Sequence, residues 1–143
     1  MAEGGSPAPH GDRSAGPVTG GCACGGIRYE TRGWLRDVVD CHCERCRRIT
    51  GHFMAATQSL DADLVVADSG TLRWYEPAVG IYYGFCGRCG STLFWRAAGA
   101  GRTSIAAGTI DPPTGLTTTT AWYTDQASDY HRLDPSLDQH ALE

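Results

Sequence analysis

Short stretches in which apolar and polar residues alternate recur along the chain, and turn-forming residues separate them. Residues 27–31, Ile-Arg-Tyr-Glu-Thr, alternate with a period of two, which is typical of a strand with one buried face. Apolar stretches and stretches rich in β-branched and aromatic residues predict further strands, at residues 38–39, 53–60, 64–66, 72–75, 81–85, 92–95, 104–107 and 117–123. Nineteen glycines and seven prolines supply the turns between them. The pattern therefore predicts a mainly β protein.

One segment departs from this pattern and predicts a short helical turn. Glu44 and Arg48 are four residues apart, so their opposite charges would meet on one helix face. Gly51 follows and would end the turn, because glycine readily adopts the left-handed backbone conformation found there.

The ordered part of the chain is predicted to be one domain spanning residues 20–133. Residues 1–19 are rich in glycine, proline, alanine and serine. They would form a flexible tail, because they bury too little apolar surface to offset the entropy of ordering. His10 lies in this tail and is predicted to be solvated rather than a ligand. Residues 134–143 are polar and would fray.

Charge and composition argue against two classes of partner. The net charge is −4, whereas nucleic-acid-binding domains usually carry a basic face. No run of about 18 apolar residues is present, so no membrane span is expected. The N-terminus lacks the apolar segment of a signal peptide. The oligomeric state is left open.

Seven cysteines are many for 143 residues, and their spacing predicts metal binding. They form three groups, C-x-C at Cys22 and Cys24, C-x-C-x-x-C at Cys41, Cys43 and Cys46, and C-x-x-C at Cys86 and Cys89. The odd number and the lack of a signal peptide favour a cytoplasmic protein that uses these thiols for metal rather than for disulfides.

The simplest division of the thiols gives two zinc sites. The first and third groups together would hold one ion in a closed tetrahedron, which would clip the start of the domain to its middle. Arg28 and Arg88 lie next to these two groups and would screen the negative charge of the site. The middle group would form the second site.

The middle group offers three sulfurs, which leaves one of zinc's four positions for water or a substrate thiol. Zinc held in this way depresses the pKa of a bound thiol and leaves the thiolate nucleophilic. The three cysteines are therefore the predicted catalytic residues. Arg45, Arg47 and Arg48 surround them, and Arg47 and Arg48 are predicted to hold substrate carboxylates in bidentate pairs.

Each feature of this site also has a structural interpretation. His52 or an aspartate would complete the coordination and make the site purely structural. His42, between two ligands, is expected to point away from the metal, as a packing residue or as an acid–base group. The arginines would instead form a solvated face. Most aromatic residues would fill the core, with one or two lining a pocket: Trp74, Tyr82, Tyr83, Phe85, Trp95 and Trp122.

Three blocks of the sequence together resemble one known family. They are Gly-Cys-Ala-Cys-Gly-x-Ile-x-Tyr from residue 21, Cys-His-Cys-x-x-Cys-Arg-Arg-x-Thr-Gly from residue 41, and Phe-Cys-Gly-Arg-Cys-Gly-Ser-x-Leu-Phe from residue 85. Their order is that of the glutathione-dependent formaldehyde-activating enzymes and centromere protein V. The resemblance implies a β-tent-type zinc fold of several small antiparallel sheets with few helical turns. It also implies one structural and one catalytic zinc, with the same division of the cysteines.

The activity of that family is the condensation of glutathione with formaldehyde to S-hydroxymethylglutathione, formally the reverse of a carbon–sulfur lyase reaction. The resemblance therefore implies a zinc enzyme that joins glutathione, or another thiol, to formaldehyde or a similar small carbonyl, or that catalyses the reverse. Two other readings of the residues remain. One is a non-catalytic zinc-binding interaction module, and the other is a redox sensor whose middle group forms a disulfide and releases its metal.

Overall fold

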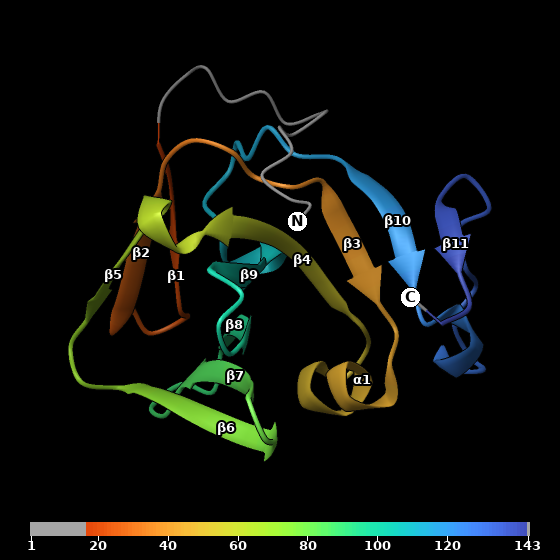
Figure 1. The fold of residues 1–143 in the computed structure, drawn as a ribbon, viewed down its shortest axis with the longest axis horizontal. Coiled ribbons are helices and arrows are strands. Elements are labelled where there is room, and N and C mark those ends of the chain that lie inside the picture. Colours follow the sequence, from red (N-terminus) through yellow and green to blue (C-terminus); the bar gives the residue numbers. More distant parts are fainter. Residues whose placement is uncertain (1–16, 143) are drawn as a thin grey trace.

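A computed structural model describes residues 17–142, which form a mainly β fold of two sheets (Figure 1). The smaller sheet has the strand order β1-β2-β5, and the larger has the order β11-β10-β3-β4-β9-β8-β7-β6. The strands of the smaller sheet are β1 (Val18–Gly21), β2 (Ile27–Thr31) and β5 (Leu64–Asp68). Those of the larger sheet are β3 (Val38–Cys41), β4 (Met54–Leu60), β6 (Leu72–Ala78), β7 (Ile81–Cys86), β8 (Thr92–Ala97), β9 (Arg102–Ala106), β10 (Thr118–Trp122) and β11 (Asp138–His140). The predicted fold class is confirmed.

The larger sheet is more extensive than the small antiparallel sheets that the resemblance implies, and it is mixed. β10 pairs in parallel with both β3 and β11, while the remaining neighbouring strands pair antiparallel. The sheet curls from β10 and β3 through β4 and β9 to β7 and β6, and the helix α1 lies beside the ends of β3 and β4 (Figure 1). This curvature brings strands that are distant in sequence around a common space.

Each predicted strand is present, with shifts of a few residues at the ends. The alternation of apolar and polar residues in β2 reflects one buried face, as predicted. Ile27, Tyr29 and Thr31 are buried, while Arg28 is exposed. β9 begins at Arg102, two residues before the predicted start. Three short 3-10 helices connect strands: η1 (Asp61–Asp63), η2 (Ala107–Thr109) and η3 (Thr124–Gln126).

The predicted helical turn is the helix α1 (Glu44–Thr50). Its N-cap is Cys43, whose Sγ accepts a hydrogen bond from the Cys46 amide at 3.4 Å. Gly51 ends the helix with φ of 87°, and the Arg48 guanidinium lies 2.9 Å from the Glu44 carboxylate, as the sequence predicts. None of the helices in residues 17–142 is long and apolar enough to cross a membrane.

Some residues of both predicted tails form strands. His10 and the rest of residues 1–16 lie outside the described residues, but β1 already begins at Val18, which is buried. At the other end, residues 138–140 do not fray. They form β11 beside β10, and Asp134 organises the preceding turn by accepting 2.8 Å hydrogen bonds from the Ser136 amide and hydroxyl. Backbone pairing needs no apolar side chains, so the hydrophobic pattern carries no sign of this strand.

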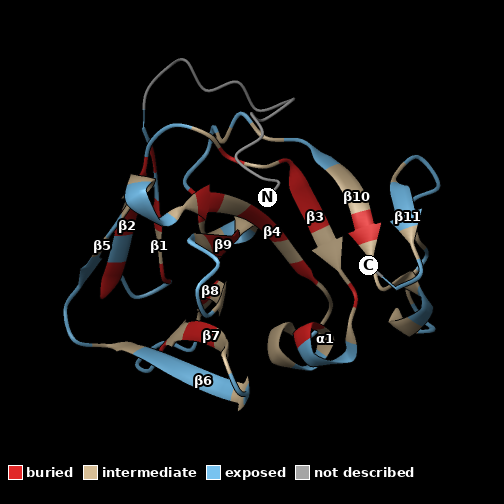
Figure 2. Cartoon of the chain, in the orientation of Figure 1, coloured by how far each residue is buried: buried red, intermediate tan, exposed pale blue. Residues whose placement is uncertain are grey.

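The core divides into two clusters of buried side chains. The larger joins the smaller sheet to β7, β8 and β9, and its fully buried members include Ile27, Leu93, Phe94 and Ile105. The smaller surrounds Cys46 and contains Met54, Ala56 and Tyr83. Buried residues lie on β2, β3, β4, β7 and β9, whereas β6 is largely exposed (Figure 2). Each cysteine group thus adjoins one part of the core.

Candidate metal centres and the adjoining cavity

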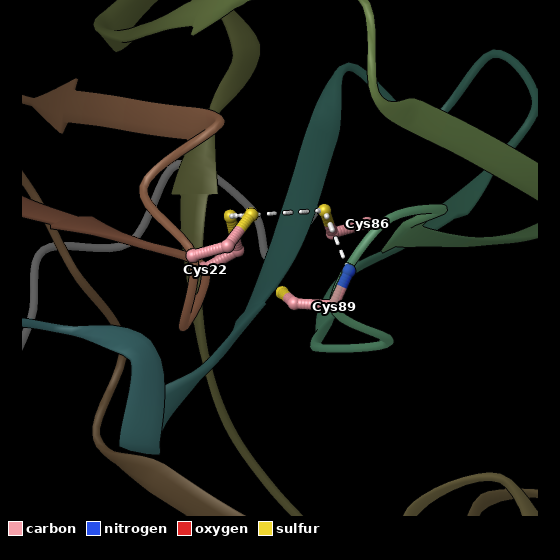
Figure 3. Close-up of side chains that lie close together, drawn as sticks. Cys22, Cys86 and Cys89 are labelled. Atoms are coloured by element: carbon pink, nitrogen blue, oxygen red, sulfur yellow. Dashed lines mark hydrogen bonds between the residues drawn. The ribbon is translucent and has the colours of Figure 1, made fainter.

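The first and third cysteine groups meet at one point. Cys22 and Cys24 lie in the turn between β1 and β2, and Cys86 and Cys89 lie at the turn between β7 and β8. The Cys24 Sγ is 3.6 Å from the Cys22 Sγ and 3.7 Å from the Cys86 Sγ, and all four sulfurs lie within 4.8 Å of one another. Figure 3 shows the side chains of Cys22, Cys86 and Cys89 converging from the two turns. The site joins the smaller sheet to the larger one.

These four sulfurs, called the four-cysteine cluster below, fit a zinc ion. A tetrahedron with zinc–sulfur bonds of about 2.3 Å places its sulfurs about 3.8 Å apart, close to the separations observed. The backbone of the two turns favours this convergence, since Gly25 and Gly90 both have φ near 80° and their amides bond to the carbonyls of Cys22 and Cys86. Glycine adopts this conformation without strain, so each turn can close tightly.

Hydrogen-bond donors surround the four-cysteine cluster. The Cys86 Sγ accepts from the amides of Arg88 and Cys89 at 3.4 Å, and the Arg88 Nε–H donates to the Cys24 Sγ at 3.3 Å. The hydroxyl of Ser91 is the main cause that lowers the pKa of Cys89 to about 5. Such donors stabilise thiolates, the form that binds metal. Arg88 therefore lies where the sequence predicts.

Arg28 is the other arginine predicted to screen the charge of the four-cysteine cluster, and it forms an ion pair. Its Nη2 lies 2.5 Å from the carboxylate of Asp111, which also accepts a hydrogen bond from Thr19. The pair links β2 to the segment after β9.

The middle group is also convergent. Cys41 is the last residue of β3, Cys43 is the N-cap of α1, and Cys46 lies in the first turn of that helix. Their sulfurs lie within 4.8 Å of one another. The Cys46 Sγ also lies 3.1 Å from the hydroxyl of Tyr83, which comes from β7 across the curled sheet. The expected convergence of these three sulfurs, called the cysteine trio below, is present.

The thiols of the cysteine trio do not have equal proton affinities. Hydrogen bonds from Cys41 and Cys46 lower the pKa of Cys43 well below its ordinary value. The same interactions raise the pKa of Cys46, because one thiolate in the group makes ionisation of a second unfavourable. A bound cation removes this penalty, so the donor set suits a divalent, thiophilic metal.

No histidine, aspartate or glutamate in residues 17–142 joins the cysteine trio as a fourth potential ligand. The Nδ1 of His52 instead lies 2.6 Å from the hydroxyl of Tyr130. His42 is buried and packs against Phe53 and His131, with ring centroids 4.9 and 5.3 Å away. It lines a separate cavity of about 320 Å³, so it points away from the trio, as its position between two cysteines predicts.

A cavity of about 1060 Å³ adjoins the cysteine trio. Alternate residues of β4 form part of its wall, namely Met54, Ala56 and Gln58, because side chains two apart in a strand share a face. Residues of β3, α1, β7, β8, β9 and β10 and of the segments that connect strands also line it. Cavities of this size accommodate small organic ligands, and all three cysteines of the trio line this one.

The arginines of the cavity differ from those expected. Arg48 lines it, but the Arg47 Nε–H donates to the Gln126 carbonyl at 3.1 Å and Arg47 is absent from the lining. Arg45 contributes as well, together with Arg36 and Arg102, neither of which was predicted from the sequence. Arg36 and Arg102 are far apart in the sequence, so no spacing pattern connects them. In the structure, the segments that contain them both bond to β4.

More aromatic residues line the cavity than the one or two expected. Trp95, Trp122 and Tyr83 face it, and so do Trp34 and Tyr123, which no sequence pattern singled out. Aromatic walls exclude water and leave their edges and faces available to a ligand.

Comparison with known protein families matches residues 17–126 to the family described as glutathione-dependent formaldehyde-activating enzyme. A search of curated proteins finds no match. Among solved structures, a protein from Rhodobacter sphaeroides is similar, with 22% identity and a TM-score of 0.56. The alignment covers 71% of this chain and 99% of the other. That likeness supports the fold described above for this chain.

Proposed function

Because the chain belongs to the family of glutathione-dependent formaldehyde-activating enzymes, we propose that it is a zinc enzyme acting on carbon–sulfur bonds. It joins glutathione, or another thiol, to formaldehyde or a similar small carbonyl, or catalyses the reverse reaction. The observation that carries the proposal is the convergence of three sulfurs on the wall of a cavity large enough for a peptide thiol. A cytoplasmic location accords with it, because the reducing cytosol keeps such thiols available.

The two cysteine clusters have separate roles in this proposal. The four-cysteine cluster holds a structural zinc, because it offers four sulfurs and joins two sheets. The cysteine trio would hold the catalytic zinc, which would act as a Lewis acid and lower the pKa of a bound thiol. Arg48 contributes to binding from the cavity wall, and Arg47 contributes indirectly by anchoring α1 to Gln126.

The residues of the cavity prepare the thiol for addition. Met54, Ala56 and the aromatic walls exclude water, so the sulfur meets the carbonyl carbon in a largely apolar setting. The sulfur gives up its proton and forms the new bond to carbon, while the carbonyl oxygen takes up a proton and becomes a hydroxyl. In the reverse direction the carbon–sulfur bond breaks, the hydroxyl loses its proton and the sulfur regains one.

The direct test is metal analysis of the purified protein together with a kinetic assay. We expect two zinc ions per chain. Glutathione and formaldehyde combine spontaneously, so the assay must measure the exchange rate, for which carbon-13 exchange spectroscopy is suited. A clear rise in the exchange rate with enzyme concentration is expected. Two bound zinc ions without acceleration for any small carbonyl would instead favour a non-catalytic zinc-binding module.

Tyr83→Phe tests how the cysteine trio is held. The Tyr83 hydroxyl contacts the Cys46 Sγ at 3.1 Å, and its ring is almost fully buried. Removal of the hydroxyl should lower zinc affinity at the trio, or turnover, by about ten- to one-hundredfold, as for other residues that support metal ligands. Competition with a chromophoric chelator gives the affinity.

Tyr29→Phe is the matched control for this variant. Tyr29 is equally buried, but its hydroxyl bonds to Thr109 at 2.7 Å, away from the cavity. Each substitution removes one hydrogen bond, so both variants should lose similar stability, about 1 kcal/mol. If Tyr83→Phe and Tyr29→Phe leave zinc affinity and turnover equally unchanged, the hydroxyl does not support the trio.

A further inference from the structure

Two hydrogen bonds and an aromatic contact hold Arg36 in the wall of the large cavity. Its Nη2 donates to the Ala56 carbonyl at 3.0 Å and its Nε to the Asp37 carbonyl at 3.3 Å. The guanidinium carbon also lies 5.1 Å from the ring centroid of Trp122. A guanidinium has five N–H donors, and these two hydrogen bonds to neutral carbonyls leave most of them for other acceptors.

Arg102 belongs to the same region of the cavity. It starts β9 opposite Leu60, and it shares a face of that strand with Ser104. Its guanidinium carbon lies 5.8 Å from the ring centroid of Trp34. Ser104 pairs with Gln58, whose amide donates to the serine hydroxyl at 3.4 Å. This end of the cavity is therefore polar and cationic.

The two arginines repel one another. Burial, joined by the charge of Arg102, lowers the pKa of Arg36 to about 10, against the attraction of Cys41 and Asp37. Burial also lowers the pKa of Arg102. Among residues 17–142, four arginines line the cavity, against the one carboxylate of Glu44. Cations that are partly removed from water near each other favour the binding of an anion.

The distance from the cysteine trio restricts what that anion can be. The Arg36 side chain donates a hydrogen bond to the carbonyl of Ala56, which is two residues along β4 from Met54. Met54 pairs with Cys41 in the neighbouring strand. Two strand residues span about 7 Å. An extended peptide covers a similar distance in two residues. A peptide whose cysteine sulfur lies at the trio therefore places its own carboxylate near Arg36.

We infer that Arg36 and Arg102 form an anion-binding subsite for the carboxylates of the thiol substrate. This inference rests on the proposed function and narrows its substrate to thiols with a carboxylate about two residues from the sulfur, glutathione being one such peptide. Guanidinium groups suit this role because they bind carboxylates through paired N–H groups. The stacked tryptophans keep those groups oriented.

Kinetics with charged and uncharged thiols test the inference. The wild-type protein should favour glutathione over glutathione diethyl ester by about ten- to one-hundredfold in kcat/KM, the range of one or two charge-assisted hydrogen bonds. Arg102→Gln should lose that preference, chiefly through a higher KM for glutathione. Arg32→Gln is the control, because Arg32 is exposed in β2's flanking turn and pairs with Glu30 at 2.6 Å, away from the cavity.

Arg36 needs a second variant because its side chain also anchors backbone carbonyls. Arg36→Lys retains the charge but not the planar pair of donors. It should fold, as thermal unfolding will show, and should retain only part of the preference for glutathione. Equal kcat/KM for glutathione and its diethyl ester in the wild-type protein, or an unchanged preference in Arg102→Gln, would overturn the inference while leaving the proposed function intact.

A binding measurement separates the inference from the proposed function. S-methylglutathione has no thiol to react but keeps both carboxylates, and its binding can be followed by calorimetry. It should bind the wild-type protein about tenfold or more tightly than it binds Arg102→Gln. Arginine-dependent binding without any turnover would refute the proposed function and uphold the subsite. Turnover combined with S-methylglutathione binding that does not depend on the arginine would refute the subsite and uphold the proposed function.

Discussion

Cys43→Ser is expected to lose its enzymatic turnover entirely while it keeps its fold and one of two zinc ions. Serine is a good N-cap residue, so its hydroxyl can accept the Cys46 amide hydrogen bond that the Cys43 Sγ accepts now. The helix α1 should therefore persist. A serine hydroxyl is a poor zinc ligand beside thiolates, so the trio should no longer hold its ion. Metal analysis and the exchange assay together measure both effects.

Thr50→Ser is the control for that variant. Thr50 ends the same helix and its hydroxyl donates to the Cys46 carbonyl at 2.8 Å, an interaction that serine preserves. It should bind two zinc ions and turn over normally. Undiminished turnover in Cys43→Ser would show that the cysteine trio is not the catalytic site. A loss of both zinc ions would show that the two clusters do not bind metal independently.

Cys89→Ser is expected to damage the fold far more than Cys43→Ser. The four-cysteine cluster joins turns that are more than 60 residues apart, between the smaller sheet and the larger one. A metal that closes so long a loop restricts the unfolded chain strongly, whereas the cysteine trio spans only six residues. The melting temperature of Cys89→Ser should fall by about 10 °C or more, and that of Cys43→Ser by a few degrees.

Chelation gives an independent measure of the same difference. A strong chelator should lower the melting temperature of the wild-type protein and of Cys43→Ser, but it should change Cys89→Ser little, because that variant has already lost its structural ion. Equal melting temperatures for the two cysteine variants would contradict the division into a structural and a catalytic site.

The local features of this protein follow from its sequence because they depend on neighbouring residues. Alternation places Ile27 and Tyr29 on the buried face of β2. Gly51 ends α1, because glycine adopts the left-handed conformation that the helix terminus requires. The short spacing from Cys41 to Cys46 brings three sulfurs together at the junction of a strand and a helix.

The sequence alone does not decide whether Arg47 or Arg48 lines the cavity. Consecutive helix residues point in directions about 100° apart, so adjacent residues of α1 can have different surroundings. The sequence does not tell which side of a seven-residue helix packs against η3. The structure decides this, since Arg47 binds the Gln126 carbonyl and Arg48 lines the cavity. The strand at residues 138–140 was missed for a related reason, because its backbone pairs with β10 whatever its side chains are.

The sequence by itself determined the mainly β class, most of the strands and the grouping of seven thiols, since each depends on periodicity or on spacing within a few residues. Only the tertiary structure decided what surrounds the cysteine trio. Arg36 and Arg102 are 66 residues apart in sequence and become neighbours because β4 lies between β3 and β9 in the curled sheet. Strand pairing depends on contacts between distant segments, and no short pattern along the chain specifies which of them meet.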